Sequence, residues 1–252
     1  MTKCMIVVPC YNEEKRLRPD TFRDFAGTHS DTIFLFVNDG STDGTRALLD
    51  SLANEGPHFR ALQLDRNGGK AEAVRQGLLQ AAREGAEYAG YWDADLATPL
   101  EMVPEFAAHL NDHPQVHMVF GARVRLLGRR IHRKLSRHYL GRLFATTVSL
   151  LFGVPVYDTQ CGAKLFRLTP EVVRLFHEPF HSRWIFDVEL LARYLRDCPL
   201  SGGLTIDDRV HELPLRAWED VGASKVRPRD FLKAIVELGR IRRGWRRADP
   251  LP

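Results

Sequence analysis

The chain has 252 residues, of which 44% are hydrophobic and 27% charged, and its formal net charge is +4. These ordinary fractions exclude disordered and fibrous classes, and the length suits one large domain or two small ones. No apolar run is long enough to span a bilayer, and the first residues lack the layout of a signal peptide. The four cysteines form no Cys-x-x-Cys pair, so we expect a reducing, cytoplasmic compartment.

The first half of the chain alternates predicted strands and predicted helices. Apolar, β-branched runs predict strands over residues 4–9, 32–37, 59–64, 87–92 and 116–121. Amphipathic segments predict helices over residues 13–25, 41–53, 70–84 and 99–110, with Ser41 and Thr42 as N-caps. This alternation predicts a Rossmann-like, doubly wound α/β sheet that is mostly parallel, with its ligand site beyond the carboxyl ends of the strands.

The second half is less regular. We predict helices over residues 133–151, 170–177, 185–196 and 228–243, and strands over residues 163–168 and 210–214. No internal repeat or linker is visible, so a single domain is expected.

Basic residues are concentrated in two places. No acidic residue occurs between Asp112 and Asp158, a gap that contains seven arginines and a lysine, and residues 240–247 form a second basic run. Such patches attract phosphorylated ligands, anionic lipid or nucleic acid. A solvated surface is the alternative interpretation.

An Asp-Ala-Asp motif follows the predicted strand 87–92. Two residues apart on an extended chain, the carboxylates of Asp93 and Asp95 point to the same side. Paired oxygen ligands suit Mg²⁺ or Mn²⁺, with water and substrate phosphates completing the coordination. The motif therefore predicts a divalent metal site at a strand end.

Other polar residues also stand at predicted strand ends. Asp39 could accept hydrogen bonds from a ribose or a base, although its Asn-Asp-Gly-Ser context is also good turn sequence. Glu13 could equally complement a helix dipole. The Asn67–Lys70 segment predicts a flexible loop whose lysine contacts phosphate or sugar oxygens, or simply a turn with a solvated lysine. A dehydrogenase is excluded because the first strand is followed by Pro-Cys-Tyr-Asn-Glu-Glu rather than a glycine fingerprint.

Taken together, several motifs resemble those of the inverting family 2 glycosyltransferases of GT-A fold. The motifs are PCYNEE, VNDGSTDG, NGGK, DAD, GAR, DTQCGAKLF, RWIFDVELL and WEDVGASK. Within that family the sequence is most similar to the dolichyl-phosphate β-glucosyltransferases, followed by the polyprenyl-phosphate mannosyltransferases. The similarity runs from about residue 4 to about residue 235.

The resemblance implies roles for individual positions. The implied nucleotide-sugar residues are Pro9, Tyr11, Glu13, Asp39, Lys70, Asp93 and Lys225. The implied metal ligands for Mg²⁺ or Mn²⁺ are Asp93 and Asp95, and the implied acceptor-phosphate residues are Arg123, Arg129, Arg133 and Arg137. Asp187 and Arg123 are the implied catalytic residues. Ala97 stands where some mannosyltransferases of the family have a metal-binding Gln, so other groups must complete the coordination.

Three further residues carry open alternatives. Asp187 and Glu189 lie about 200° apart on a helix, so only one of them can face the site, and a solvated acid is the alternative for both. Asp158 could be a helix or turn cap. Cys161 is expected to be a small buried residue rather than a nucleophile.

The implied activity is metal-dependent, inverting transfer of a hexose from a nucleotide sugar, with UDP-glucose favoured, to a polyprenyl (dolichyl or undecaprenyl) phosphate. A GDP-mannose donor and a soluble hydroxyl acceptor remain alternatives. A phosphate acceptor is already ionised at neutral pH, so it needs cations more than a general base. The implied organisation is one domain with a nucleotide-sugar half (1–122), an acceptor half (123–228) and a basic tail (229–252).

A lipid acceptor implies a membrane surface as a partner. The segments 129–152 and 231–247 combine arginines with apolar residues, so we expect peripheral binding at the inner, anionic face of a membrane. The alternative is that both segments pack on the sheet. A processive synthase is disfavoured because Phe180 replaces the Gln of its motif. An inactive nucleotide-sugar binder is disfavoured because the aspartates are intact. A nucleic-acid partner is disfavoured because the sequence contains no recognised nucleic-acid-binding motif.

Overall fold

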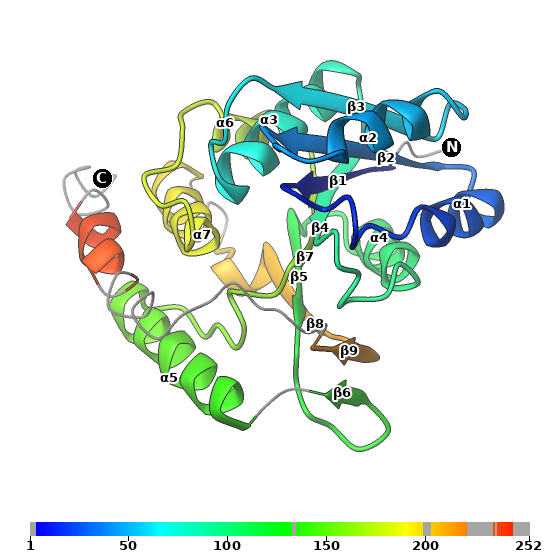
Figure 1. Ribbon diagram of the computed structural model, residues 1–252. Coiled ribbons are helices and arrows are strands. Elements are labelled where there is room, and N and C mark those ends of the chain that lie inside the picture. Colours follow the sequence, from blue (N-terminus) through cyan, green and yellow to red (C-terminus); the bar gives the residue numbers. More distant parts are fainter. Residues whose placement is uncertain (1–3, 133–134, 199–202, 221–233, 235, 244–252) are drawn as a thin grey trace.

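The computed structural model describes residues 4–132, 135–198, 203–220, 234 and 236–243. Its central sheet has seven strands, and β7 is antiparallel to its neighbours β4 and β5 while all other neighbouring pairs are parallel. In sheet order the strands are β3 (Phe59–Leu64), β2 (Thr32–Asp39), β1 (Cys4–Cys10), β4 (Tyr88–Trp92), β7 (Ala163–Arg167), β5 (Met118–Ala122) and β8 (Val210–Pro214). The predicted mostly parallel α/β sheet is confirmed (Figure 1).

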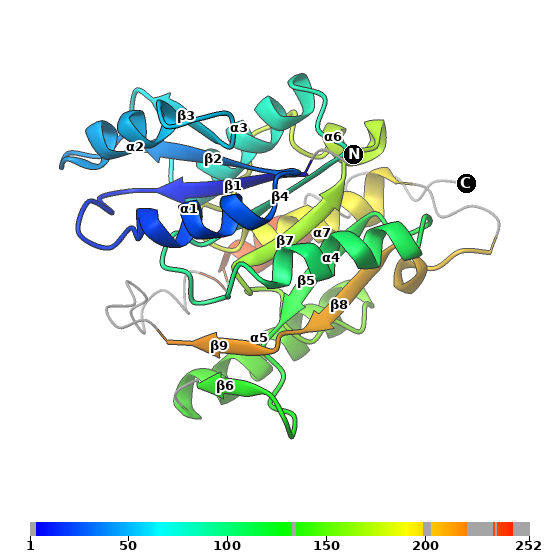
Figure 2. The same ribbon diagram turned by 90° about the vertical axis from the view of Figure 1, so that its right-hand side faces the viewer.

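Helices cover both faces of this sheet. Successive side chains of β1 point to opposite faces, so Ile6 and Val8 belong to one apolar core and Met5 and Val7 to another. The first core includes residues of α1 (Pro19–Thr28), α2 (Thr45–Ala53) and α4 (Met102–Asp112). The second includes residues of α3 (Lys70–Arg83), α6 (Pro170–Arg174) and α7 (Phe186–Asp197). Figures 1 and 2 show this layering from two sides.

The strand order reverses between β1 and β4, and doubly wound sheets have their ligand-binding crevice at such a reversal. From β1 the chain builds outward through β2 and β3 on one side and through β4 on the other. Ligands of doubly wound sheets bind at such a reversal, outside the carboxyl ends of the strands. Since Val7 pairs with Tyr91, the segments that follow Cys10 and Trp92 emerge at the same edge.

The second half of the chain adds a long helix and a small second sheet. Helix α5 (Leu135–Phe152) shares a third apolar core with α7 and with residues 236–243, through Val148, Val188 and Leu238. β6 (Arg130–His132) pairs in parallel with β9 (Ala217–Glu219), and η1 (Ile206–Asp208) precedes β8. The β6–β9 pair was not predicted, because three-residue strands leave no readable alternation. In the part of the chain that the structure describes, no helix is long and apolar enough to cross a membrane.

Three helices begin later than the sequence indicated. The expected starts at residues 13, 41 and 99 are wrong, since α1, α2 and α4 begin at Pro19, Thr45 and Met102. Residues 13–17 form only a single isolated turn, in which the Leu17 N–H donates to the Glu13 carbonyl at 2.8 Å. The segments around Asn12 and Ser41 bind each other, and Gly44 rather than Ser41 or Thr42 is the N-cap of α2. The Asn12 N–H donates to Ser41 Oγ at 3.0 Å, and the Thr42 N–H donates to Asn12 Oδ1 at 2.9 Å. Proline at the first position then starts α1, where its missing N–H is not needed.

Candidate active site

The Asp93-Ala-Asp95 segment forms a turn at the end of β4 rather than an extended strand. The Leu96 N–H donates to the Asp93 carbonyl at 3.1 Å, and Leu96 itself is left-handed with φ of 54°. The expectation that both carboxylates project from an extended chain is therefore wrong. Backbone strain of this kind persists where neighbouring contacts enforce it, here including the bond from the Ala97 N–H to Asp95 Oδ1 at 3.1 Å.

Gly162 leaves the space that Asp93 occupies. The Asp93 N–H donates to the Gly162 carbonyl at 3.0 Å, and a Cβ on Gly162 would lie 1.8 Å from Asp93 Oδ2. Any larger residue would collide with this carboxylate. The glycine of the DTQCGAKLF motif thus fits the position of Asp93.

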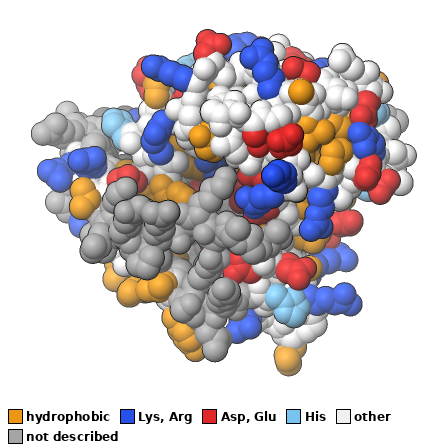
Figure 3. Space-filling model, in the orientation of Figure 1, with side chains coloured by type: hydrophobic (Ala, Val, Ile, Leu, Met, Phe, Trp, Pro, Cys, Tyr) orange, Lys and Arg blue, Asp and Glu red, His pale blue; other side chains and the backbone are white. Residues whose placement is uncertain are grey.

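Each carboxylate of the motif faces a cation. Lys70 Nζ lies 2.5 Å from Asp93 Oδ1, and Arg16 Nη2 lies 3.7 Å from Asp95 Oδ2. Burial and the charge of Asp93 raise the pKa of Asp95 above its usual range. Burial alone would lower the pKa of Lys70, but Asp93, Asp187 and Asp95 raise it overall. Acidic and basic side chains accordingly lie side by side near the centre of the face in Figure 3.

The acidic pair fits a divalent cation shared with a bound ligand. Among the described residues, no group of three or more histidine, cysteine or acidic side chains is arranged to hold a metal ion by itself. Asp93 and Asp95 nevertheless place two carboxylates close together, and the charge of Asp93 contributes to the raised pKa of Asp95. Mg²⁺ commonly binds one or two such carboxylates together with water and substrate phosphates.

The predicted nucleoside residues gather at the neighbouring strand ends. Pro9 and Asp39 lie at the carboxyl ends of the paired strands β1 and β2, and Tyr11 and Glu13 follow β1. Tyr11 is exposed, whereas Glu13 and Asp39 are buried. The residues are thus brought to one edge of the sheet.

Asp39 also holds the loop that precedes α3. Its two carboxylate oxygens accept the N–H groups of Gly68 and Gly69 at 2.7 and 2.8 Å. Burial raises the pKa of Asp39, although both of these hydrogen bonds oppose the shift. A turn interpretation for the neighbouring Asn38 and Ser41 is also correct, since Asn38 Oδ1 accepts the Ser41 N–H at 3.1 Å.

Arg123 forms a buried ion pair at the end of β5. Its Nε and Nη2 donate to Asp158 at 2.6 and 2.8 Å, and its guanidinium lies 5.3 Å from the centre of the Trp218 ring. Glu212 of β8 supports this pair by accepting the N–H groups of Tyr157 and Asp158 at 2.6 and 2.7 Å. Burial lowers the pKa of Arg123, but the charge of Asp158 raises it overall, so the cation is permanent. The capping interpretation of Asp158 also holds, because the same side chain accepts the Gln160 N–H at 3.3 Å.

The remaining predicted acceptor residues are less completely described. Arg129 is exposed in the loop between β5 and β6. Only the backbone of Arg137 is described, in the first turn of α5, while Arg133 and Lys225 lie outside the described residues. The predicted cluster of four arginines therefore lies partly outside the described residues.

Asp187 lies in a buried polar network beneath the acidic pair. It accepts a hydrogen bond from the Tyr91 hydroxyl, and Lys164 Nζ lies 2.8 Å from the same carboxylate oxygen. Lys164 is fully buried and also donates to the carbonyls of Thr159 and Cys161 at 3.0 and 2.7 Å. Burial and the charge of Asp187 raise the pKa of Tyr91, so the phenol keeps the proton that it donates.

The two acids of α7 contact different partners. Glu189 accepts the His181 N–H at 2.9 Å and pairs with Arg193 at 2.8 Å, away from Asp187. The predicted separation around the helix is confirmed, and the solvated interpretation is wrong for both acids, which are each 4% exposed.

Sequence reasoning missed Lys164, Tyr91 and Arg16. A lysine flanked by apolar residues in the predicted strand 163–168 was the available signal, because a central strand has no solvent for it. Cys161 is confirmed as a buried residue, and burial raises the pKa of its thiol to about 11.

Solved structures with a similar fold include enzymes crystallised with UDP. Glucosyl-3-phosphoglycerate synthase of Mycobacterium tuberculosis in complex with UDP superposes with a TM-score of 0.63 at 18% identity, over 96% of this chain and 80% of that one. Another structure of that enzyme also contains Mn²⁺ and phosphoglyceric acid, and it gives a TM-score of 0.61. The fold is therefore that of the GT-A glycosyltransferases, as the motifs implied.

Sequence comparison identifies the family. The family model "Glycosyl transferase family 2" matches residues 5–171. A dolichyl-phosphate β-glucosyltransferase of Trichomonas vaginalis is 31% identical over 248 residues, covering 93% of this chain and 69% of that protein. The dolichyl-phosphate β-glucosyltransferase of Mus musculus is 32% identical, covering 88% and 69%. This chain belongs to glycosyl transferase family 2 and is a glycosyltransferase.

Proposed function

We propose that this enzyme transfers glucose from UDP-glucose to a polyprenyl phosphate, with inversion at the anomeric carbon and with a divalent metal. The observation that carries the proposal is the acidic pair of Asp93 and Asp95 at the reversal between β1 and β4, with Lys70 and Arg16 against it. A divalent cation held by the two acids, together with Lys70 and Arg16, would neutralise the negative charge of a leaving diphosphate. The choice of sugar and acceptor follows the similarity to dolichyl-phosphate β-glucosyltransferases over most of the chain.

The donor lies along the carboxyl ends of β1, β2 and β4 in this proposal. Pro9, Tyr11, Glu13 and Asp39 bind the nucleoside, and Lys70 and Lys225 contact the diphosphate. Asp95, with Asp93, holds Mg²⁺ or Mn²⁺, whose chemistry is to neutralise the charge that develops on the leaving diphosphate. Before the donor binds, Lys70 pairs with Asp93 and Arg16 pairs with Asp95.

The acceptor phosphate approaches from the end of β5. Its dianion attacks directly, because a phosphate monoester has its second pKa near ~6 and needs no base. Arg123 lies there with its charge balanced by Asp158, and Arg129, Arg133 and Arg137 are proposed to supply further positive charge. Asp187, which Tyr91 and Lys164 hold in place, is proposed to act near Lys70 in this scheme.

A lipid acceptor requires a surface that meets the bilayer, and we assign this role to α5. Tyr139, Leu143 and Leu150 of this helix are 68%, 65% and 81% exposed, and apolar side chains gather along it at the lower left of Figure 3. The exposed Arg125, Arg129 and Arg130 precede it. This placement corresponds to peripheral binding at an anionic membrane face. The packing alternative fits part of the second segment better, because Leu238 and Ile241 are buried against α5 and α7.

The test is transfer by the purified enzyme with defined donors and acceptors. We expect Mn²⁺- or Mg²⁺-dependent formation of glucosyl dolichyl phosphate from UDP-glucose, lost with EDTA, and little product from GDP-mannose. Dolichol and 3-phosphoglycerate serve as the comparison acceptors, one without a phosphate and one without a lipid. Turnover of 3-phosphoglycerate but not of dolichyl phosphate would refute the lipid acceptor, and preference for GDP-mannose would refute the donor.

A further inference from the structure

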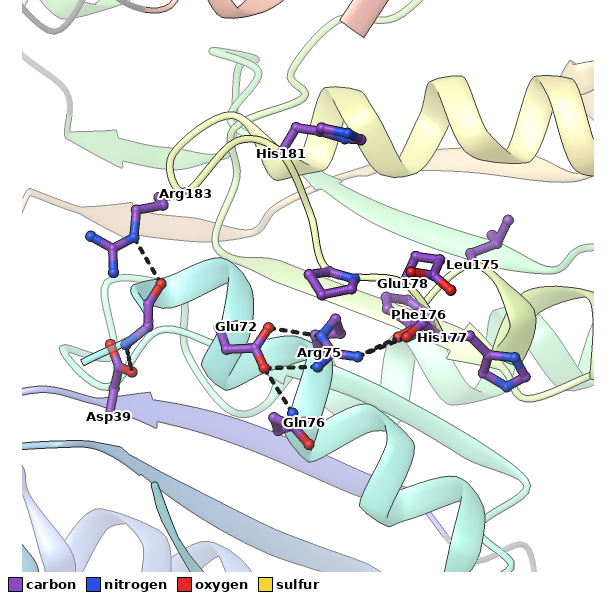
Figure 4. Close-up of polar contacts among 12 residues, drawn as sticks. Asp39, Glu72, Arg75, Gln76, Leu175, Phe176, His177, Glu178, His181 and Arg183 are labelled. Carbon is purple, nitrogen blue, oxygen red and sulfur yellow. Dashed lines mark hydrogen bonds and ion pairs between the residues drawn. The ribbon is translucent and has the colours of Figure 1, made fainter. Parts of the chain in front are cut away.

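The loop that precedes α3 is held from two sides. Below it, Asp39 accepts the N–H groups of Gly68 and Gly69. Above it, Arg183 donates from Nε to the Gly68 carbonyl and from Nη2 to the Asn67 carbonyl, both at 2.9 Å. Figure 4 shows Asp39 and Arg183 on opposite sides of this loop. The loop leads directly into Lys70, whose ammonium contacts Asp93.

Without such contacts the loop would have many conformations. Gly69 has φ of 89°, in the region that glycine visits freely, and it is followed at once by the first residue of α3. The position of Lys70 at the donor site therefore depends on what fixes Asn67, Gly68 and Gly69. Asp39 fixes the N–H side, and Arg183 fixes the carbonyl side.

Arg183 belongs to a segment that is itself firmly anchored. Residues 175–183, here called the bracket segment, connect α6 to α7. The buried Arg75 of α3 donates to the carbonyls of Phe176 and His177 at 3.1 and 3.0 Å (Figure 4). The bracket segment is thus tied to α3, the helix that Lys70 begins.

α7 anchors the bracket segment from the other side. The buried Arg193 donates to the carbonyls of Leu175, Glu178 and Pro179 at 2.7 Å each. Glu189 accepts the N–H groups of His181 and Ser182 at 2.9 and 3.1 Å. Because the bracket segment is anchored on both sides, the backbone of Arg183 has little freedom to move where its side chain binds the Asn67–Gly69 loop.

From this geometry we propose that Arg183 is a positioning residue for the donor: it holds the Asn67–Gly69 backbone so that Lys70 meets the diphosphate. The proposal rests on the proposed function, since the donor is taken to be a nucleotide sugar. A guanidinium suits the role because its planar fork can donate to two neighbouring carbonyls at once, which an ammonium cannot do with the same geometry. The role is indirect, through the loop and Lys70.

The bonds of Arg183 are accessible to a clean test because its side chain is exposed, unlike Arg75 and Arg193. The variants are Arg183→Met, which removes the donors, and Arg183→Lys, which keeps the charge. Arg46→Met on α2 is the matched control, because Arg46 is an exposed arginine that lies 4.0 Å from Asp50. The measurements are amide hydrogen exchange at Gly68 and Gly69, and the KM for UDP-glucose, the KM for dolichyl phosphate and kcat.

We expect Arg183→Met to speed exchange at Gly68 and Gly69 and to raise the donor KM about tenfold, the scale of one charged hydrogen bond. The acceptor KM and the melting temperature should stay near those of wild type and of Arg46→Met. Arg183→Lys should behave like Arg183→Met. Full recovery of the donor KM in Arg183→Lys would instead mean that Arg183 contacts the donor through its charge, and it would overturn the proposal.

Two other outcomes would also overturn it. Unchanged exchange at Gly68 and Gly69 in Arg183→Met would show that Asp39 alone fixes the loop. A parallel fall of stability, kcat and both affinities would show a purely structural role. If wild type turns over no nucleotide sugar, the proposed function fails, yet the exchange measurement still decides whether Arg183 holds the loop.

Discussion

The carboxyl of Asp95 is held in a setting that disfavours its charge. Burial and Asp93 raise its pKa, so in the folded protein it takes up a proton at a higher pH than an ordinary carboxyl with pKa near ~4. Because ionised Asp95 is disfavoured in the fold, it lowers stability at neutral pH, and this penalty disappears below the pKa of the unfolded chain. A metal ion would offset the same penalty.

Asp95→Asn is therefore expected to separate activity from stability. We expect transfer to be nearly abolished, because an amide is a poor replacement for a charged ligand. The free energy of unfolding at pH 7 should equal or exceed that of wild type, and the difference should vanish below about pH 4. Urea unfolding at several pH values and the transfer assay measure both effects, with the exposed Asp65→Asn as the control. Metal-dependent turnover that survives in Asp95→Asn would contradict the assignment.

Arg123 and Asp158 make a residue-scale prediction about stability. Both side chains are about a tenth exposed, and removing one partner leaves the other charge buried. We expect Arg123→Met to lower the free energy of unfolding by about 3–5 kcal/mol and the double variant with Asp158→Asn to recover part of that loss. Chemical denaturation provides the measurement. Arg196→Met, which breaks the exposed pair with Asp197, should change stability by less than about 1 kcal/mol. An equally small effect at Arg123 would argue against a buried, dependent pair.

At the scale of elements, the turn after β4 depends on the glycine opposite it on the chain leading into β7. In Gly162→Ala the new methyl group would displace the Asp93 carboxylate from Lys70. Since misplacement of a catalytic group by about 1 Å commonly costs a factor of about a hundred, we expect a loss of that order in kcat. The transfer assay, with circular dichroism to verify the fold, tests this. Gly27→Ala on α1 has open space around its Cβ and should leave activity unchanged. Equal activity of the two variants would contradict the role of Gly162.

The elements also show what the sequence could and could not predict. Continuous apolar runs predict buried strands such as β1 and β2. The predicted strand ends therefore placed Asp39, Asp93 and Asp95 correctly at the carboxyl ends of β2 and β4. Ser41 and Thr42 looked like helix caps, but their partner is Asn12, about thirty residues away in the chain. The residues next to Ser41 and Thr42 in the sequence do not indicate a hydrogen-bond partner as distant as Asn12.

The same limit applies inside the site. Asp187 and Glu189 both looked like helix acids, and only tertiary contacts show that Lys164 binds one and Arg193 the other. Arg123 was expected to face a phosphate, and its bond with Asp158 required two segments that are 35 residues apart. The residue types were readable from the sequence, whereas their partners were set by the sheet order.

For the whole molecule, the proposed lipid acceptor implies that α5 binds a bilayer surface. We expect the enzyme to bind anionic vesicles and to release them in high salt, because exposed arginines lie beside the apolar side chains of α5. Leu143→Ser combined with Leu150→Ser should weaken binding in co-sedimentation at low salt. Ala47→Ser, a change of an exposed apolar residue on α2, is the control. Vesicle binding that is equal in all three proteins would refute the role of α5.

The antiparallel strand β7 has a consequence for the distance over which the reaction takes place. It lies between β4, which ends at Asp93, and β5, which ends near Arg123, and it bonds to both. Adjacent strands are about 4.8 Å apart, so the two strand ends are separated by two such steps, or about 10 Å. In the proposed reaction these two strand ends bind the leaving and the attacking phosphate, and the interval between them cannot change without breaking backbone hydrogen bonds. Loops can change which sugar fits within that interval, but the interval itself is built into the order of the strands.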